Sequence, residues 1–298
     1  MLTRDERLTV EWVDPRGKVW NLTDGTEGVI LDVGQSDFTL SPLEHHYVRG
    51  GTQWAGVTRE RAEPSLKVVV GYDLKSSAYY QLADEWWSKA NSADHPGTLR
   101  ITRPDGVVRY LTARLRDTPG TTYQFDPGAG LDDPPGEPWL LTSPSAFYDG
   151  DMQLTRFTLD SLAVGTPFYG PDGTGWPLYI GEAFSAGNIT AENNGEGPVW
   201  PVWTLTGPLS NAYLAVGDGR GLTFDGALGD GQSVRITTEP GARSVVDLTT
   251  GESLYSVVRG TYQPIPAGRE IPMTITADGM TTSSAIEVRF SEKYVRPF

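Results

Sequence analysis

The residues best suited to acid–base or metal chemistry in this 298-residue sequence are its three histidines, His45, His46 and His95. His45 and His46 are adjacent in a segment that we expect to be extended. Successive side chains of a strand point to opposite faces, so these two rings cannot simply hold one metal ion together. His95 precedes Pro96 at the expected end of a helix. The pattern favours structural or solvated roles for all three histidines.

The 38 Asp and Glu residues show no catalytic spacing. Glycoside hydrolysis needs two acids about 5–10 Å apart across a cleft, and candidates such as Glu182 and Glu192 have no distinctive sequence setting. Residues 217–231 repeat Asp-Gly but lack the ligand register of a calcium loop, whereas Asp-Gly is also what hairpin turns require. Motifs of serine hydrolases, zinc proteases and nucleotide-binding loops are absent. We therefore expect no catalytic, metal or cofactor residue.

Tryptophans are the remaining candidates for ligand contact, because an exposed indole can stack on a sugar. The candidates are Trp176, Trp200 and Trp203. Residues 199–206 alternate as a strand does, which puts Trp200 on one face and Trp203 on the other. Only one of them could therefore lie on a given binding surface. Trp200 and Trp203 stay candidate ligand or interface aromatics, beside the alternative that one lies in the core and the other at an edge or interface.

The elements that would carry these residues are mostly strands. The 35 glycines and 22 prolines are typical of many short strands joined by turns. Two alternating runs within residues 98–116 predict a β-hairpin, with its turn at residues 104–106. From residue 193 onward, turn signals recur about every 8–12 residues, which indicates an antiparallel sandwich.

One helix is predicted over residues 76–91, from apolar side chains that recur every three or four positions. Ser76 or Ser77 could cap its first amides, and Tyr80 and Trp87 widen its apolar stripe. The residues at this spacing are Tyr79, Leu82, Ala83, Trp86 and Ala90.

Composition also excludes several classes of protein. The sequence has no cysteine, so disulfides, thiol nucleophiles and Cys-ligated zinc are excluded. The net charge is −14 and no dense basic cluster is present, which argues against tight nucleic-acid binding. No apolar run reaches about 18 residues, and the charged N-terminus does not resemble a signal peptide. We expect no membrane insertion.

Residues 193–214 and the segments after them resemble the distal tail proteins of long-tailed siphophages, in particular the minor tail proteins of actinobacterial phages. Pro266 and Gly268 retain part of a late family turn, while Ala212 and Thr237 depart from the family pattern. The residues that match the start of the family's C-terminal domain and its next strand are Asn194, Gly195, Pro201, Gly207, Pro208, Asn211, Gly229, Asp230 and Ile236.

The resemblance implies a mainly β fold in two parts. Residues 1–160 would form an N-terminal β-rich belt domain with one helix, and residues 161–298 a C-terminal galectin-like antiparallel β-sandwich. The matching positions are turn and packing residues, so the resemblance supplies no catalytic residue.

The resemblance also implies a structural virion protein without enzymatic activity. It would form a hexameric ring at the tail tip, assembled in the host cytoplasm, with the tail tube protein, tape-measure protein and tail-tip hub protein as partners. Six copies would carry roughly −84 charges (6 × −14), so DNA could pass through the ring without specific binding. The alternative is a β-sandwich module that binds a host glycan for attachment; a hydrolase is the third hypothesis.

Overall fold

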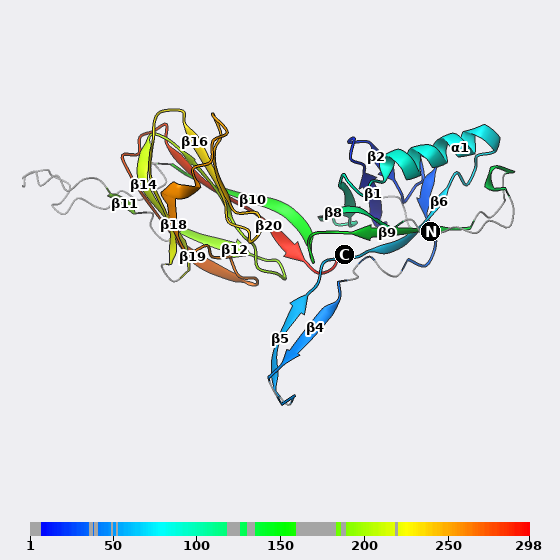
Figure 1. Ribbon diagram of the computed structural model, residues 1–298, viewed down its shortest axis with the longest axis horizontal. Helices are drawn as coiled ribbons and strands as arrows, with labels where there is room; N and C mark the ends of the chain where they lie inside the picture. Colours follow the sequence, from blue (N-terminus) through cyan, green and yellow to red (C-terminus); the bar gives the residue numbers. More distant parts are fainter. Residues whose placement is uncertain are drawn as a thin grey trace, which may run out of the picture. The chain divides into compact units, whose positions relative to one another are not determined.

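The computed structural model describes residues 7–35, 38, 41–48, 50–51, 53–117, 126–129, 135–158, 183–185, 189–217 and 220–298. Strands in antiparallel sheets dominate these residues, which confirms the prediction of a mainly β chain. Contacts divide the chain into two units, Met1–Asp151 with Lys293–Phe298, and Met152–Glu292 (Figure 1). The chain thus leaves the first unit after Asp151, before the boundary expected near residue 160, and its last six residues return to it.

The first unit is built on two runs of paired strands that share one strand, β8. Along the first run the order is β10-β8-β7-β1-β2, and along the second it is β8-β9-β6-β3. The predicted hairpin is confirmed, because β7 pairs with β8 from Gly97↔Ala113 to Thr102↔Val108. The strands are β1 (Thr9–Val13), β2 (Val19–Asn21), β3 (Val29–Leu31), β6 (Ser65–Val70), β7 (Gly97–Thr102), β8 (Val108–Asp117), β9 (Glu137–Thr142) and the start of β10 (Tyr148–Thr158).

The predicted helix is present as α1 (Ser76–Asp84), which continues as a π-helical segment (Glu85–Ala90). The expected serine cap is wrong: Lys75 occupies the cap position and makes no side-chain cap hydrogen bond, while Ser76 has a φ of 55°. Tyr80 is exposed rather than part of the buried stripe. A single-turn 3-10 helix, Pro127–Ala129, lies against α1.

Four buried indoles form the centre of the first unit. Trp12 and Trp86 each lie within 5.3 Å of the ring of Trp139, and the Trp20 ring is 5.2 Å from Trp86. Indole N–H groups also close two long-range hydrogen bonds, from Trp12 Nε1 to the Ala90 carbonyl at 2.8 Å and from Trp139 Nε1 to Asn91 Oδ1 at 2.7 Å. The end of the helical segment is therefore fixed to the sheet by both packing and hydrogen bonds.

The second unit is a β-sandwich. One sheet has the order β17-β16-β13-β20-β10, and the other has the order β11-β19-β14-β15-β18 with β12 also paired to β19. Buried side chains from both sheets form one core cluster. The strands are β11 (Ala183–Ser185), β12 (Ile189–Asn193), β13 (Val202–Thr206), β14 (Leu209–Val216), β15 (Gly221–Leu228), β16 (Ser233–Thr237), β17 (Ser244–Asp247), β18 (Val258–Gly260), β19 (Arg269–Asp278) and β20 (Ala285–Tyr294); the 3-10 turn Tyr255–Val257 precedes β18.

The stretch that carries the family resemblance runs from the end of β12 into β13 and β14 of the sandwich. The Asn193 side chain is fully buried, donates to the carbonyls of Gly197 and Ile265, and accepts from the amide of Gly195. The peptide bond between Gly207 and Pro208 is cis and joins β13 to β14. These turn residues therefore have local structural roles.

A third, two-stranded sheet belongs to the first unit. It consists of β4 (Leu43–Tyr47) and β5 (Trp54–Arg59), which pair only with each other in the described part of the chain. Figure 1 shows this hairpin extending away from the other sheets of its unit.

Candidate interaction site

The β4–β5 hairpin has one apolar face. Partners across an antiparallel pair share a face, and the register pairs Tyr47 with Trp54 and His45 with Val57. Leu43 is two residues before His45 and lies on the same side. We call this surface the hairpin face; it consists of Leu43, His45, Tyr47, Trp54 and Val57, with Arg59 at its base.

The hairpin face is exposed to solvent. The exposed fractions are 58% for Tyr47, 57% for Trp54, 47% for Leu43 and 41% for Val57. Scattered exposed apolar residues are ordinary, but a contiguous set on one side of a projecting hairpin marks an interaction surface. A two-stranded hairpin is also only marginally stable unless another surface packs against it.

The other face of the hairpin is polar. His46 Nε2 lies 2.6 Å from Thr58 Oγ1 on this side, whereas His45 Nδ1 accepts from Trp54 Nε1 at 3.3 Å on the hairpin face. The two histidine rings thus point to opposite faces, which confirms that prediction. At the base, the amide of Glu60 donates to the Pro42 carbonyl at 2.9 Å.

The hairpin face was not predicted from the sequence. Its signal is the alternation of Leu43, His45 and Tyr47, followed by two glycines and a second short run that contains Trp54 and Val57. Both Gly50 and Gly51 have positive φ, as the turn requires. An alternating strand, however, has the same pattern whether its apolar side is buried or uncovered.

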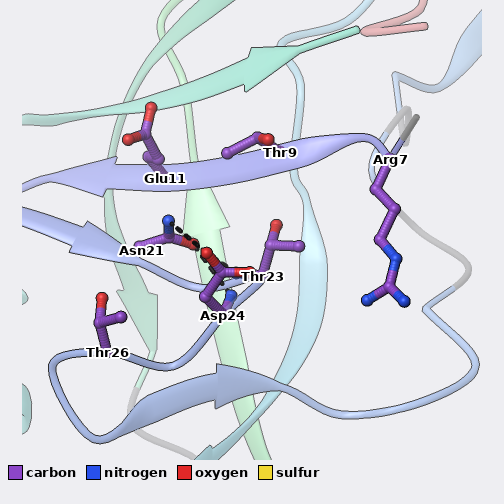
Figure 2. A pocket seen from close by; sticks show the side chains of 7 residues that line it. All are labelled: Arg7, Thr9, Glu11, Asn21, Thr23, Asp24 and Thr26. Carbon is purple, nitrogen blue, oxygen red and sulfur yellow. Dashed lines mark hydrogen bonds between the residues drawn. The ribbon is translucent and has the colours of Figure 1, made fainter. Parts of the chain in front are cut away.

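A polar recess of about 590 Å³ opens on the outer side of β1 and β2 (Figure 2). Its polar atoms already serve the local fold. Asn21 Oδ1 accepts from the amides of Thr23 and Asp24, both at 3.0 Å, and Glu11 forms an ion pair with Arg100 at 2.6 Å. The recess therefore presents an ordered polar surface without a nucleophile and its base. It is lined by Arg7, Thr9, Glu11, Asn21, Thr23, Asp24 and Thr26.

The structure places the two candidate tryptophans differently. Trp203 lies in the core of the sandwich with 2% of its surface exposed, whereas Trp200 is half-buried just before β13. Val199 and Leu205 are buried on the same side as Trp203, so the expected alternation is observed. Trp176 lies outside the described residues.

The other candidate residues do not form a site. Glu192 is exposed on β12, and its suggested partner Glu182 lies outside the described residues. His95 is exposed, and its backbone amide donates to Ser92 Oγ. Within the described ranges, no three His, Cys, Asp or Glu side chains come together as metal ligands would.

Two tyrosines have shifted pKa values for structural reasons. Burial raises the pKa of Tyr262 to about 12, and burial also raises the pKa of Tyr148 above its ordinary value. The hydroxyl of Tyr148 donates to the carbonyl of Phe38 at 2.5 Å. Neither tyrosine is suited to act as a base near neutral pH.

No helix in the described part of the chain is long and apolar enough to cross a membrane.

A β-rich unit with one helix, followed by a β-sandwich, defines the class of fold found in phage tail-hub proteins. A particular solved structure with this fold is the SPP1 Dit protein, described as a paradigm of the hub adsorption apparatus in phages that infect Gram-positive bacteria. It is 12% identical, with a TM-score of 0.58, and the match covers 96% of this chain and 99% of that one.

A chain of the phage P2 baseplate, in its activated conformation with Ca, is similar over 95% of this chain and 98% of its own length. Its identity is 13% and its TM-score is 0.50. No protein-family model and no curated protein matches the sequence. At these identities, the likeness establishes the shared fold.

Proposed function

We propose that this chain is a structural virion protein of a phage tail tip, a distal tail adaptor of the siphophage type. Six copies would form a ring that joins the tail tube to the tip complex around the DNA channel. The observation that carries this proposal is the hairpin face, whose exposed Tyr47 and Trp54 form a surface suited to a protein partner. Fold similarity to a hub protein over nearly the whole chain supports the same role.

A ring of identical subunits needs two different surfaces that fit each other, and it needs no active site. The proposed neighbours are the tail tube protein, the tape-measure protein and the hub protein. The net charge of −14 per copy suits a bore along which DNA slides without adhering. The protein would act in the virion after assembly in the host cytoplasm, without turnover of a substrate.

The proposal is tested by locating the protein in virions. An antibody against this chain, applied to purified virions, is expected to label the tail end remote from the head. Particles made in a non-suppressing host from a phage with an amber codon in this gene are expected to lack assembled tails. Label on the capsid, or normal tails without the protein, would contradict the proposal.

The alternative function is a module that binds host glycans. With Trp203 buried in the sandwich core, this alternative depends on Trp200, which retains partial exposure. A single half-buried indole offers little stacking surface for a sugar ring. The structural role is therefore the better supported proposal.

A further inference from the structure

Residues Lys293–Phe298 belong to the first unit, although the whole sequence of the sandwich separates them from the rest of that unit. We call them the returning segment. The chain leaves the first unit after Asp151 and comes back at Lys293, and these two passages are neighbours within the unit, because Lys293 Nζ forms an ion pair with Asp149 Oδ1 at 2.5 Å. The sandwich is therefore an insertion in the first unit, and the returning segment completes that unit.

The ring of Tyr294 covers the junction of two strands of the first unit. Strands β8 and β10 pair there through Tyr110 and Asp149, so the adjacent Arg109 and Gly150 share a face. The guanidinium carbon of Arg109 lies 3.3 Å from the centroid of the Tyr294 ring, and a Cβ added to Gly150 would lie 2.7 Å from Tyr294 Cε2. The φ of Gly150 is outside the left-handed range, so the Tyr294 ring, and not the backbone, leaves no room for a larger residue.

The returning segment also covers Phe38. The rings of Phe298 and Phe38 meet edge-on, with their centroids 6.1 Å apart and their planes at 77°. Phe38 is buried, whereas Phe298 is more than half exposed, so Phe298 shields Phe38 from solvent. The hydroxyl of Tyr148, at the start of β10, donates to the carbonyl of Phe38. Phe38 is thus held by one hydrogen bond and one ring contact.

Phe38 lies on the part of the chain that enters the β4–β5 hairpin, five residues before β4. The part that leaves the hairpin has a backbone attachment, because the amide of Ala62 donates to the Ser145 carbonyl at 2.8 Å. On the entering side, Phe38 provides the corresponding attachment. One of these two attachments of the hairpin therefore depends on Phe298 of the returning segment.

We propose that the returning segment is a clasp, which holds the β8–β10 junction and the entering side of the hairpin and is released without unfolding of the sandwich. None of the described core residues of the sandwich belongs to this segment, so its release leaves that core intact. The inference concerns contacts within one copy and holds whether or not the copies form a ring.

The test is hydrogen exchange of the full-length protein, measured by mass spectrometry. Tyr294→Ala removes the ring that covers the junction. Amides in peptides that contain Phe38 or Asp149 should then exchange at least about tenfold faster than in the wild type. Peptides from β13 and β14 of the sandwich should exchange as in the wild type. Arg296→Ala, which removes an exposed side chain of the same segment, is the control and should leave all of these rates unchanged.

Gly150→Ala tests the same contact from its other partner. The added Cβ should displace the Tyr294 ring and accelerate exchange in the same peptides. Because Tyr294→Ala empties the space that this Cβ needs, the double variant should exchange no faster than Tyr294→Ala alone. Two independent destabilising effects would instead add.

Three results would overturn the clasp. They are wild-type exchange in Tyr294→Ala, additive effects of the two substitutions, and loss of protection throughout both units in Tyr294→Ala. The last result would show that the returning segment and the sandwich unfold together. The oligomeric state, measured separately by sedimentation velocity, tests the proposed ring and not the clasp.

Discussion

The indole Nε1–H of Trp54 donates a hydrogen bond to Nδ1 of His45 over 3.3 Å, across the two strands of the projecting hairpin. An indole nitrogen only donates, so Nδ1 of His45 is the acceptor in this contact. The bond is long and exposed. It orients the indole within the hairpin face, while the apolar area of the ring is what a partner would bury.

Substitution of Trp54 by Phe separates these two contributions. Trp54→Phe keeps a large aromatic surface but removes the N–H, so self-association should weaken by less than about tenfold. Sedimentation velocity over a concentration series measures this effect, with Trp54→Ser as the comparison. If the Phe and Ser variants lose association equally, the hydrogen bond rather than the apolar area controls the hairpin face.

Asp14 should make the first unit sensitive to acid. Its buried carboxylate accepts from the amides of Arg16 and Lys18 at 2.8 and 3.0 Å and from the Arg16 guanidinium at 2.7 Å. Burial alone raises the pKa of Asp14, but these hydrogen bonds together outweigh burial, so its pKa lies below the ordinary value. A depressed carboxyl pKa stabilises the folded state above the unfolded pKa of about 4, and this stability is lost as the pH falls through the folded pKa.

The Asp14→Asn variant should therefore be less stable than the wild type at pH 7, by about 1–3 kcal/mol. The difference should shrink below about pH 4, where Asp14 becomes protonated in the unfolded state while the folded state keeps its carboxylate down to the lower folded pKa. Urea unfolding followed by near-ultraviolet circular dichroism from pH 3 to pH 7 measures both effects. Asp84→Asn, at an exposed helical position, is the control. A constant difference across this range would show that the charge of Asp14 does not stabilise the fold.

Asn91 should be among the most sensitive positions of the first unit. Its buried amide donates to the Trp86 carbonyl at 2.9 Å and accepts from Trp139 Nε1 at 2.7 Å. Asn91→Ala leaves two buried polar groups without these partners and should lower the free energy of unfolding by about 2–4 kcal/mol. Chemical denaturation checks this value against Asp94→Ala, which removes an exposed side chain three residues away. Equal effects in the two variants would contradict the role assigned to Asn91.

The glycan alternative has its own prediction. If the protein is purely structural, bacterial cell-wall glycans should not change its tryptophan fluorescence. Trp200→Ala should then alter stability by less than about 1 kcal/mol, because the residue is only half-buried. Saturable quenching that disappears in Trp200→Ala would instead establish a binding site at this residue.

The sequence pattern predicted those elements that depend on interactions between residues close together in the sequence. The hairpin of β7 and β8 was predictable because Asp105-Gly106 supplies its turn, and Gly106 has the positive φ expected there. The helix was predictable from its apolar spacing, yet its π-helical end was not. The four-residue spacing of Trp86 and Ala90 is compatible with an α-helix and with a π-helix, so the sequence pattern does not distinguish these two helix types.

Long-range contacts explain what the sequence pattern could not predict. The C-terminal return to the first unit depends on contacts such as the ion pair of Lys293 with Asp149 at 2.5 Å, which no local signal specifies. The hairpin face was missed for a similar reason. Alternation indicates that Tyr47 and Leu43 share a side, but only the tertiary fold shows that nothing within the described part of the chain covers that side.

The central claim is that the hairpin face joins copies of this chain into a ring. Native mass spectrometry of the full-length protein, over a range of concentrations, tests it most directly. We expect the wild type to form a closed species of six copies, with no larger series, and Trp54→Ser to remain monomeric under the same conditions. A wild type that stays monomeric at every concentration, or a Trp54→Ser variant that forms the same closed species, would contradict the claim.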